Sequence, residues 1–419
     1  MGGHYGSAED YDDYYLQKKH TRRPKPKRKK LKPPSVQKPK PTVKPKQNVN
    51  IGSVDVSIYL VVIILVLIGV VMVFSASYAL AANRPRFNND AFYFLRRNGI
   101  MAALGFAAMH FISKFNCQIW RKGVWPLYFG TLGMLIAVTI IGLTAYGAQR
   151  WIQIPIIGQF QPSELAKAAI IFIIAHLVDK YPDALKTWGN LGLFSAIVAV
   201  AVGLVWMPGG FSAGLIIAAI GFGMIFVASP YIWRFIVPGG LFVGGVSAYL
   251  LISAHFGLNF RGARIQAWRD PWAFSDTVGF QTIQSLYAVA TGGWFGVGIG
   301  ESRQVSFIPE PQHDMIFAIV VEELGLLGAG LILILFGIFI WRGILVAMRA
   351  PDTFSSMVAI GIVFTIAFQV VINVGVVTNT IPNTGVTLPF ISYGGTSLLV
   401  TMALAGILLS ISRYSKGSG

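Results

Sequence analysis

The sequence has a single cysteine, Cys117, so a disulfide bond within the chain is impossible and cysteine usage indicates no redox compartment. Charged residues are also scarce, at 12% against about 25% in soluble domains. Apolar runs of roughly 17–25 residues, the length that crosses a hydrocarbon core of about 30 Å, are frequent instead. These features exclude an ordinary soluble protein and predict a membrane protein. The first 50 residues contain no early apolar core, so we expect no cleavable signal peptide.

Residues 1–52 form a polar tail that holds 14 Lys and Arg against four Asp and Glu. Such a segment cannot bury apolar surface, and we expect a disordered basic tail on the cytoplasmic side. Its charge favours a role as a topology signal and a tether to anionic membrane lipids. Docking of a partner protein is the alternative, whereas we expect no binding of nucleic acid.

Ten apolar spans account for most of the remaining chain and predict an all-α polytopic membrane protein with about ten transmembrane helices. The spans cover roughly residues 54–80, 97–113, 124–146, 162–179, 189–206, 209–228, 231–253, 314–341, 354–378 and 388–412.

The basic tail and loops that contain Arg121 and Arg342 fall on one side of the membrane, so the positive-inside rule predicts that both termini are cytoplasmic. Arg84 and Arg96 fall on the other side and break the pattern, but the tail carries far more charge. The membrane domain is then 53–414, followed by a short cytoplasmic end, 415–419. A large extracytoplasmic loop, residues 254–313, separates the seventh and eighth helices.

Asp314 is the strongest candidate for a general base. It follows a glycine-rich loop and a Pro-Glu-Pro sequence, and we expect it to begin the eighth helix. The helix dipole would favour its ionised form, whereas apolar neighbours would raise its pKa. A plain helix cap is the alternative role. His313 beside two acids could bind a metal, but the spacing matches no standard site, so we assign no metal ligands.

A second candidate cluster comprises Arg150 and the sequence FQPSELAK at 160–167. Glu164 and Lys167 are three residues apart and share a helix face. Ionisable residues in a span are costly and usually face protein or water. The cluster is therefore either an ion pair inside the bundle or a site where Arg150 and Lys167 hold an anionic headgroup such as a pyrophosphate.

The long loop supplies further polar candidates for substrate binding. Guanidinium groups suit phosphate oxygens, although arginines at a membrane edge also act as plain interfacial anchors. The sequence of residues 279–293 predicts a short amphipathic helix, whose side-chain amides could bind sugar hydroxyls. GVGIG at 296–300 lacks the strand and the βαβ unit of a nucleotide site. The candidates are Arg261, Arg264, Gln281, Gln284, Arg303 and Glu310.

The segment 372–397 contains only neutral hydrogen-bonding side chains, among them Ser392 and Tyr393, and no charged residue occurs from Val371 to Ser412. Its glycines and hydroxyl groups suit the wall of a groove for a sugar or a polyprenyl chain. Tight packing of the last helix is an equally weighted alternative.

Together these motifs resemble the SEDS family (shape, elongation, division and sporulation) of polytopic peptidoglycan polymerases. The matching elements are RWI, QPSELAK, GGWFGVGIGESRQ, IPEPQHDMIFAIVVEELGLLG and TGVTLPFISYGGTSLL, in family order over about residues 54–414. Thr387 and the ending ISRYSK resemble the division branch, the FtsW proteins, more than the elongation branch, the RodA proteins. The common family motif Pro-Glu-x-His-Thr-Asp-Phe is altered here around His313 and Met315.

The resemblance implies a glycosyltransferase that polymerises lipid II at the outer leaflet of a bacterial cell membrane and releases undecaprenyl pyrophosphate. It implies a class B penicillin-binding protein and other division proteins as partners, a septal location, and Asp314 as the catalytic residue. No cofactor is certain, although Mg²⁺ or Mn²⁺ could take part.

A lipid II flippase and a non-catalytic division scaffold are the alternatives to a glycosyltransferase. A transporter usually shows inverted repeats and midplane sites, and we find no repeat.

Overall fold

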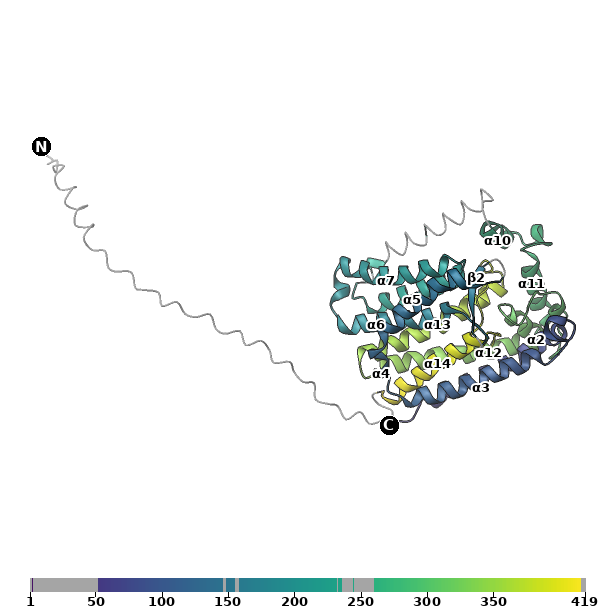
Figure 1. Ribbon diagram of the computed structural model, residues 1–419, viewed down its shortest axis with the longest axis horizontal. Coiled ribbons are helices and arrows are strands. Elements are labelled where there is room, and N and C mark those ends of the chain that lie inside the picture. Colours follow the sequence, from purple (N-terminus) through teal and green to yellow (C-terminus); the bar gives the residue numbers. More distant parts are fainter. Residues whose placement is uncertain are drawn as a thin grey trace. The chain divides into compact units, whose positions relative to one another are not determined.

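The computed structural model of the chain describes residues 52–145, 148–154, 158–231, 233–235 and 260–415, together with residues 2 and 244. The predicted basic tail lies almost wholly outside these described residues, and so does nearly all of the seventh predicted span, 231–253. Figure 1 shows long helices that run alongside one another, with α10 and α11 at one end of the bundle.

Within the described residues, the other nine predicted spans are each represented by a long helix. Seven of these helices have the length and composition to cross a membrane, and the two others, α3 and α6, carry charged side chains within them. The prediction of an all-α polytopic membrane protein is confirmed. The long helices are α2 (Val56–Ala82), α3 (Tyr93–Lys114), α5 (Val124–Ile141), α6 (Pro162–Lys180), α7 (Trp188–Trp206), α8 (Phe211–Ala228), α12 (Ile316–Met348), α13 (Thr353–Val377) and α14 (Gly395–Arg413).

Short elements lie between the long helices, and most of them are at the end of the bundle that carries α10 and α11, here called the loop end (Figure 1). The short helices are α4 (Gln118–Lys122), α10 (Phe260–Arg269) and α11 (Phe280–Gly292). The described residues also form four single 3₁₀ turns, which are η1 (Pro85–Phe87), η2 (Ala184–Lys186), η3 (Trp272–Phe274) and η4 (Gln304–Ser306).

A three-stranded antiparallel sheet at the loop end was not predicted from the sequence. Its strands β1 (Leu143–Ala145), β2 (Ala148–Ile154) and β3 (Gly158–Phe160) pair in the order β1-β2-β3. The predicted third span, 124–146, is therefore wrong at its end, because α5 stops at Ile141 and Gly142 turns to an extended conformation. Apolar composition alone did not distinguish a helix end from a short strand here. The sheet leads into Pro162 at the first turn of α6.

The start of the eighth span is also corrected. Helix α12 begins at Ile316, after Asp314, and extends to Met348. At about 1.5 Å per residue, its 33 residues are longer than a bilayer core requires. The helix is broken at Gly325, whose φ of 70° and ψ of −176° are not helical and suit glycine. The first part of α12, 316–324, is thereby a separate short helix.

The break in α12 is filled by the glycine-rich loop that precedes it. Val297 N donates to Glu322 O (2.9 Å) and Gly298 N donates to Glu323 O (3.1 Å). In return, Leu326 N donates to Gly293 O (2.9 Å). Backbone groups that the break frees from the helical ladder are thus paired, as buried polar groups in a membrane protein require.

Helix α6 is the central helix of the bundle, since 15 of its 19 residues are buried. It packs against α5, α8 and α13. A helix that is apolar on all sides is expected to be surrounded by protein. The few polar side chains of α6 near its start therefore lie inside the protein, which bears on the predicted Glu164–Lys167 cluster.

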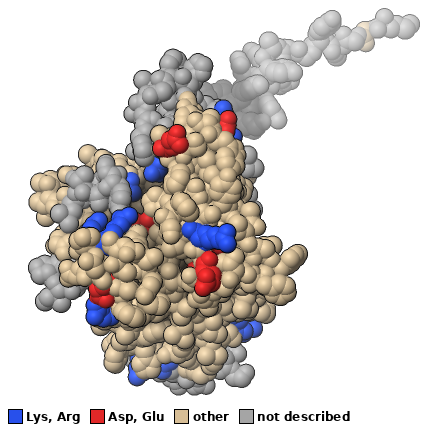
Figure 2. All heavy atoms as spheres, turned by 90° about the vertical axis from the view of Figure 1, so that its right-hand side faces the viewer, with Lys and Arg blue, Asp and Glu red and all other residues tan. Residues whose placement is uncertain are grey.

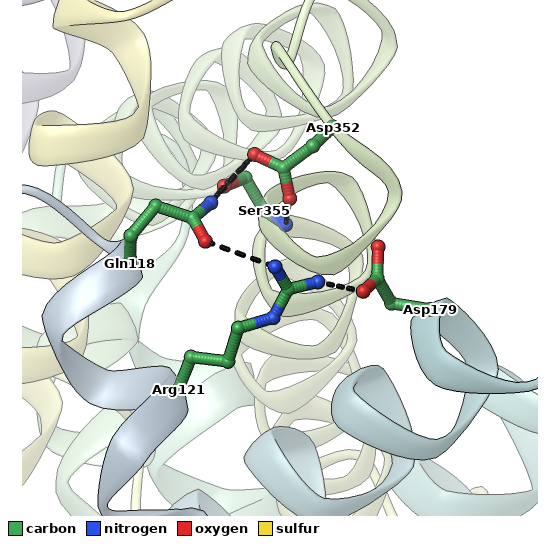
Figure 3. A network of polar contacts seen from close by, with 5 residues as sticks. All are labelled: Gln118, Arg121, Asp179, Asp352 and Ser355. Carbon is green, nitrogen blue, oxygen red and sulfur yellow. Dashed lines mark hydrogen bonds and ion pairs between the residues drawn. The ribbon is translucent and has the colours of Figure 1, made fainter. Parts of the chain in front are cut away.

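Polar contacts hold the helices together at the end opposite the loop end. Figure 3 shows Arg121 paired with Asp179 and hydrogen-bonded to Gln118, which in turn donates to Asp352 Oδ2 at 2.7 Å. Asp352 caps α13 by accepting from Ser355 N (3.1 Å). The network therefore ties α4 to α6 and α13.

Candidate functional site

Asp314 lies in a turn just before α12 and does not cap that helix. The N-cap position is Met315, which makes no side-chain capping bond. The predicted position at a helix start and the alternative of a plain helix cap are therefore both wrong. Glu310, four residues earlier, has a φ of 49°, a conformation that non-glycine residues seldom adopt and that often occurs at functional sites. The tight turn leaves the Asp314 carboxylate free of any capping role.

Asn373 on α13 holds the turn that carries Asp314. Its Nδ2 donates to the backbone carbonyl of Asp314 and to that of Val386, both at 2.7 Å. Asn373 is fully buried, so these bonds form away from water. Gly385, with a φ of 69°, lies next to the acid, because a Cβ on it would be 3.6 Å from Asp314 Oδ2. The segment between α13 and α14 is thus a wall beside Asp314, and its role in a groove for a sugar or a polyprenyl chain stays a prediction.

The polar residues of α10 and α11 meet the same wall. Arg264 Nη1 donates to the carbonyl of Asn383 (3.2 Å), and Asn383 Nδ2 donates to Gln281 Oε1 (3.1 Å). These three residues line a cavity of about 210 Å³. The other lining residues are Ala267, Trp268, Thr277, Val278, Phe280, Thr282 and Pro309. The structure therefore brings two predicted site residues, Arg264 and Gln281, together around one cavity.

Electrostatics connect this cavity to Asp314. Burial raises the pKa of Asp314 above its ordinary value, and the nearby charges of His313 and Arg264 act in the opposite direction. Burial lowers the pKa of Arg264, while the charge of Asp314 raises it. The opposite charges of Asp314 and Arg264 therefore stabilise each other. A carboxylate whose pKa is raised by burial, and whose charge acts on an arginine that lines a cavity, is the arrangement expected of a general base.

Contacts between His313, Tyr393 and Glu310 also hold the turn that carries Asp314. His313 Nδ1 lies 3.1 Å from the carbonyl of Tyr393, so the ring nitrogen is the donor, and Nε2 lies 3.4 Å from Glu310 Oε2. Tyr393 N donates to the carbonyl of Gln312 (2.9 Å), and burial raises the pKa of the Tyr393 phenol to about 12. Tyr393 and Glu310, both predicted as substrate-binding residues, are thus in contact with the segment that ends at Asp314.

Two buried acids on α12, Glu322 and Glu323, were not among the predicted site residues. Glu322 accepts from Ser302 Oγ (2.5 Å) and from the backbone N–H of Arg303 (3.1 Å). Glu323 accepts from Ser75 Oγ of α2 at 2.6 Å. Two adjacent acids within an apolar helix were the available signal, because ionisable residues in a span are costly and seldom without a role. Here Glu322 holds the loop that leads to Asp314, and Glu323 joins α12 to α2.

The predicted Arg150–Glu164–Lys167 cluster is partly assembled. Lys167 Nζ lies 2.8 Å from Glu164 Oε2, and both side chains are buried. Ser397 of α14 also donates to Glu164 Oε2 (2.9 Å). Arg150 on β2 instead donates to the carbonyl of Gly209. This geometry favours the interpretation of Glu164 and Lys167 as an ion pair inside the bundle.

The remaining predicted residues have varied surroundings. Ser392 is buried and its hydroxyl accepts from Leu388 N (2.7 Å), so it holds a turn. Arg303 is exposed, and Gln284 is half-buried three residues after Gln281 on α11. Arg261 lies on α10 one turn before Arg264, but its side chain lies outside the described part of the chain.

The described residues contain no group of three or more His, Cys, Asp and Glu side chains that could hold a metal ion. A requirement for Mg²⁺ or Mn²⁺ stays a prediction. Figure 2 views the loop end directly and shows a few charged side chains among residues that carry no charge. The candidate site therefore lies at an end of the molecule where the described residues include few charged side chains.

A bundle of long apolar helices with a carboxylate and a polar cavity at one end defines a multi-pass α-helical membrane protein with a candidate active site. Comparison with known proteins identifies the group to which it belongs. The chain belongs to the FtsW, RodA and SpoVE family, since the family model described as "Cell cycle protein" matches residues 55–417.

Individual relatives and structures agree with this assignment. Stage V sporulation protein E of Bacillus subtilis (strain 168) is 41% identical over 83% of this chain and 94% of its own length. A probable peptidoglycan glycosyltransferase FtsW of Geobacter sp. (strain M18) is 36% identical over 84% of this chain and 94% of its own.

Two solved structures share the fold. A chain of a peptidoglycan synthase complex, described as coordinating polymerization and crosslinking, has a TM-score of 0.70 at 26% identity, over 87% of this chain and 99% of that one. The rod shape determining protein RodA of Thermus thermophilus has a TM-score of 0.63 at 24% identity, over 87% and 98%.

Proposed function

We propose that this protein is a peptidoglycan glycosyltransferase that polymerises lipid II into β-1,4-linked glycan strands, with Asp314 as the general base. The observation that carries the proposal is the raised pKa of the Asp314 carboxylate together with its charge interaction with Arg264, which lines a cavity with Gln281 and Asn383. Relatives named peptidoglycan glycosyltransferase and a similar chain from a peptidoglycan synthase complex support it.

In the proposed reaction, Asp314 takes the proton from the 4-hydroxyl group of the acceptor sugar. The hydroxyl oxygen then forms a bond to the anomeric carbon of the donor, and the bond from that carbon to the pyrophosphate oxygen breaks. Attack from the opposite face inverts the α-linked donor and gives a β-1,4 bond. Undecaprenyl pyrophosphate leaves with the bonding electron pair. General-base catalysis of this kind typically contributes about 10²–10⁴-fold.

The residues around the cavity have separate roles in this proposal. The guanidinium of Arg264 offers donors to the departing pyrophosphate, since the planar fork matches phosphate oxygens. Its existing bond to the carbonyl of Asn383 holds it in place. Gln281, joined to Asn383, offers its amide to a sugar hydroxyl. We assign Arg261 and Arg303 to the same anionic group on their chemistry, because guanidinium groups suit phosphate oxygens.

We further propose that the loop end faces the cell exterior and that the enzyme acts at the division septum with a class B penicillin-binding protein. The FtsW relatives support the septal role, and the synthase complex with coordinated polymerization and crosslinking supports the partner. The elongation role of RodA is the alternative within the family.

The proposal is tested by glycan synthesis from purified components. The chain, purified with its partner penicillin-binding protein, is expected to convert lipid II into glycan strands in detergent. Asp314→Asn should abolish most of this synthesis while the complex still forms. If the purified complex left lipid II unpolymerised but moved it across vesicle membranes, the proposal would be wrong and the flippase hypothesis would be favoured.

A further inference from the structure

The loop Gly293–Ile299, here called the anchor loop, exposes its large apolar side chains. Trp294 is 68% exposed and Phe295 is 82% exposed, while Val297 and Ile299 are also on the surface. The loop contains no charged residue. Side chains of this size and polarity are seldom left in water in a group, and such a patch marks a surface that contacts another apolar medium or protein.

The anchor loop has a fixed height along the bundle. Its backbone bonds to both sides of the Gly325 break in α12, including Gly298 N to Glu323 O (3.1 Å) and Leu327 N to Trp294 O (3.1 Å). Four of its backbone groups are paired in this way, and its glycines adopt the positive φ values that the path requires. The exposed aromatic side chains therefore project from a loop whose backbone is held in place by α12.

The spacing of two polar contacts between α2 and α12 indicates that this loop lies at the level expected for an edge of the hydrocarbon core. At the opposite end, Arg342 of α12 binds Asp55 at the start of α2 with distances of 3.0 and 2.6 Å. At the loop end, Glu323 of α12 binds Ser75 of α2. Between these two polar contacts, both helices rise roughly 30 Å at about 1.5 Å per residue, which is the thickness of a bilayer core.

The apolar surface is also continuous with the face of α12 between these levels. Leu326, Leu327, Leu331 and Ile334 of α12 are all more than half exposed and directly follow the break. Trp341, 61% exposed, lies beside Arg342 at the other polar level. Tryptophan side chains at both ends of an apolar span are typical of the two membrane–water interfaces.

We propose that the anchor loop inserts Trp294 and Phe295 into the lipid of the leaflet at the loop end. The occupant of this surface is lipid, because the patch lies at the edge of the core and joins a face that must itself contact acyl chains. Glu322 lies in the first part of α12, 316–324, whose backbone also holds the anchor loop. It accepts hydrogen bonds from Ser302 and Arg303 of the segment that leads to Asp314. The anchor loop thereby sets the height of the candidate site above the lipid surface.

The depth of the loop can be measured with the full chain in vesicles of phosphatidylethanolamine and phosphatidylglycerol. A Phe295→Cys change in a Cys117→Ser background, labelled with an environment-sensitive fluorophore, reports the loop. A second variant, Ile299→Cys, tests whether the result depends on the single labelled position. Ser275→Cys, which is exposed at the same end of the molecule, is the matched control. The quenchers are lipids with a nitroxide near the headgroup end of the acyl chain, and aqueous iodide.

We expect the lipid quencher to act several-fold more strongly than iodide at positions 295 and 299, and the reverse at position 275. Quenching by iodide at 295 as strong as at 275 would overturn the proposal. Shielding of 295 from both quenchers would also overturn it, since a protein surface rather than lipid would then cover the loop. The readout does not involve glycan synthesis, so its result is independent of the proposed activity.

Discussion

The side-chain amide of Asn373 lies 2.7 Å from the backbone carbonyl of Asp314 and 2.7 Å from that of Val386. One buried residue of α13 thus joins the turn before α12 to the segment before α14. This arrangement fixes where the candidate base lies relative to the cavity wall, and it makes Asn373 a positioning residue that does not itself contact the proposed substrate.

Replacing Asn373 by Leu should reduce glycan synthesis by at least about tenfold, mostly through kcat, because a shift of about 1 Å can cost ~10²-fold in a positioned site. It leaves two buried carbonyls unpaired, at about 1–3 kcal/mol of unfolding free energy each. Turnover and thermal unfolding of the purified protein check both effects. Thr378→Ala, an exposed change at the same end of α13, is the control and should change neither. Unaltered kcat in the Leu variant would contradict the positioning role.

The raised pKa of Asp314 predicts a pH effect with a definite sign. A base is active when deprotonated, so glycan synthesis should fall on acidification, with its midpoint above the ordinary carboxyl value of 3.8. Arg264→Met removes a positive charge that lowers this pKa, so the acid limb should move to higher pH. Arg269→Met, an exposed change on the same helix, should leave the limb in place. Movement of the limb to lower pH in the Arg264 variant would contradict the assignment.

The buried pair Lys167–Glu164 should behave as a unit. Lys167→Met leaves Glu164 buried without its partner, and breaking such a pair costs about 3–5 kcal/mol. The double change with Glu164→Gln should recover most of the stability, measured by thermal unfolding. Recovery of activity together with stability would exclude direct pyrophosphate binding by Lys167. The exposed pair Lys186–Asp183 serves as the control, and Lys186→Met should leave the thermal unfolding temperature nearly unchanged, because water and salt screen an exposed ion pair.

Glu322 should hold the segment before Asp314 in place. Glu322→Ala removes the acceptor of the Ser302 hydroxyl and of the Arg303 N–H, and hydrogen bonds to charged groups contribute about 1.5–3 kcal/mol each. Amide hydrogen exchange over residues 302–306 should therefore accelerate by at least about tenfold. Glu301→Ala, an exposed acid in the same loop, is the control. Equal exchange in both variants would show that the loop is held by other contacts.

Apolar run length was sufficient to predict the helical bundle, because spans such as α2 and α13 have few charged residues and a length set by the bilayer. The same criterion failed at the end of the predicted span 124–146, because α5 stops at Ile141 and the short strand β1 follows without a marked change in composition. Residues Arg264, Gln281 and Asp314 were predicted individually from their chemistry. Their convergence on Asn383 and Asn373 was not predictable, since it depends on contacts between segments about 60–120 residues apart.

Glu322 shows a second limit of sequence reasoning. Its position in an apolar helix was visible, but the break at Gly325 was not, because a single glycine is common in membrane helices. Only the structure shows that the break turns residues 316–324 into a separate short helix, with its acids directed to the loop that precedes it.

The central claim is that Asp314 is the general base, and Asp314→Asn tests it most directly. Asparagine keeps the size of the side chain, and the Asn373 bond to the backbone carbonyl does not depend on the carboxylate. Because the raised pKa means that the protein disfavours the charged form, the Asn variant should be at least as stable as the parent at neutral pH. His313→Ala and Glu310→Gln are the neighbouring controls, with milder losses expected.

The measurement is the yield and length of glycan made from lipid II by the purified variant bound to its penicillin-binding protein. The account predicts a loss of at least ~10²-fold with the complex intact, in line with general-base contributions. Glycan of near-normal yield and length from the Asn variant would contradict it and remove Asp314 from the mechanism.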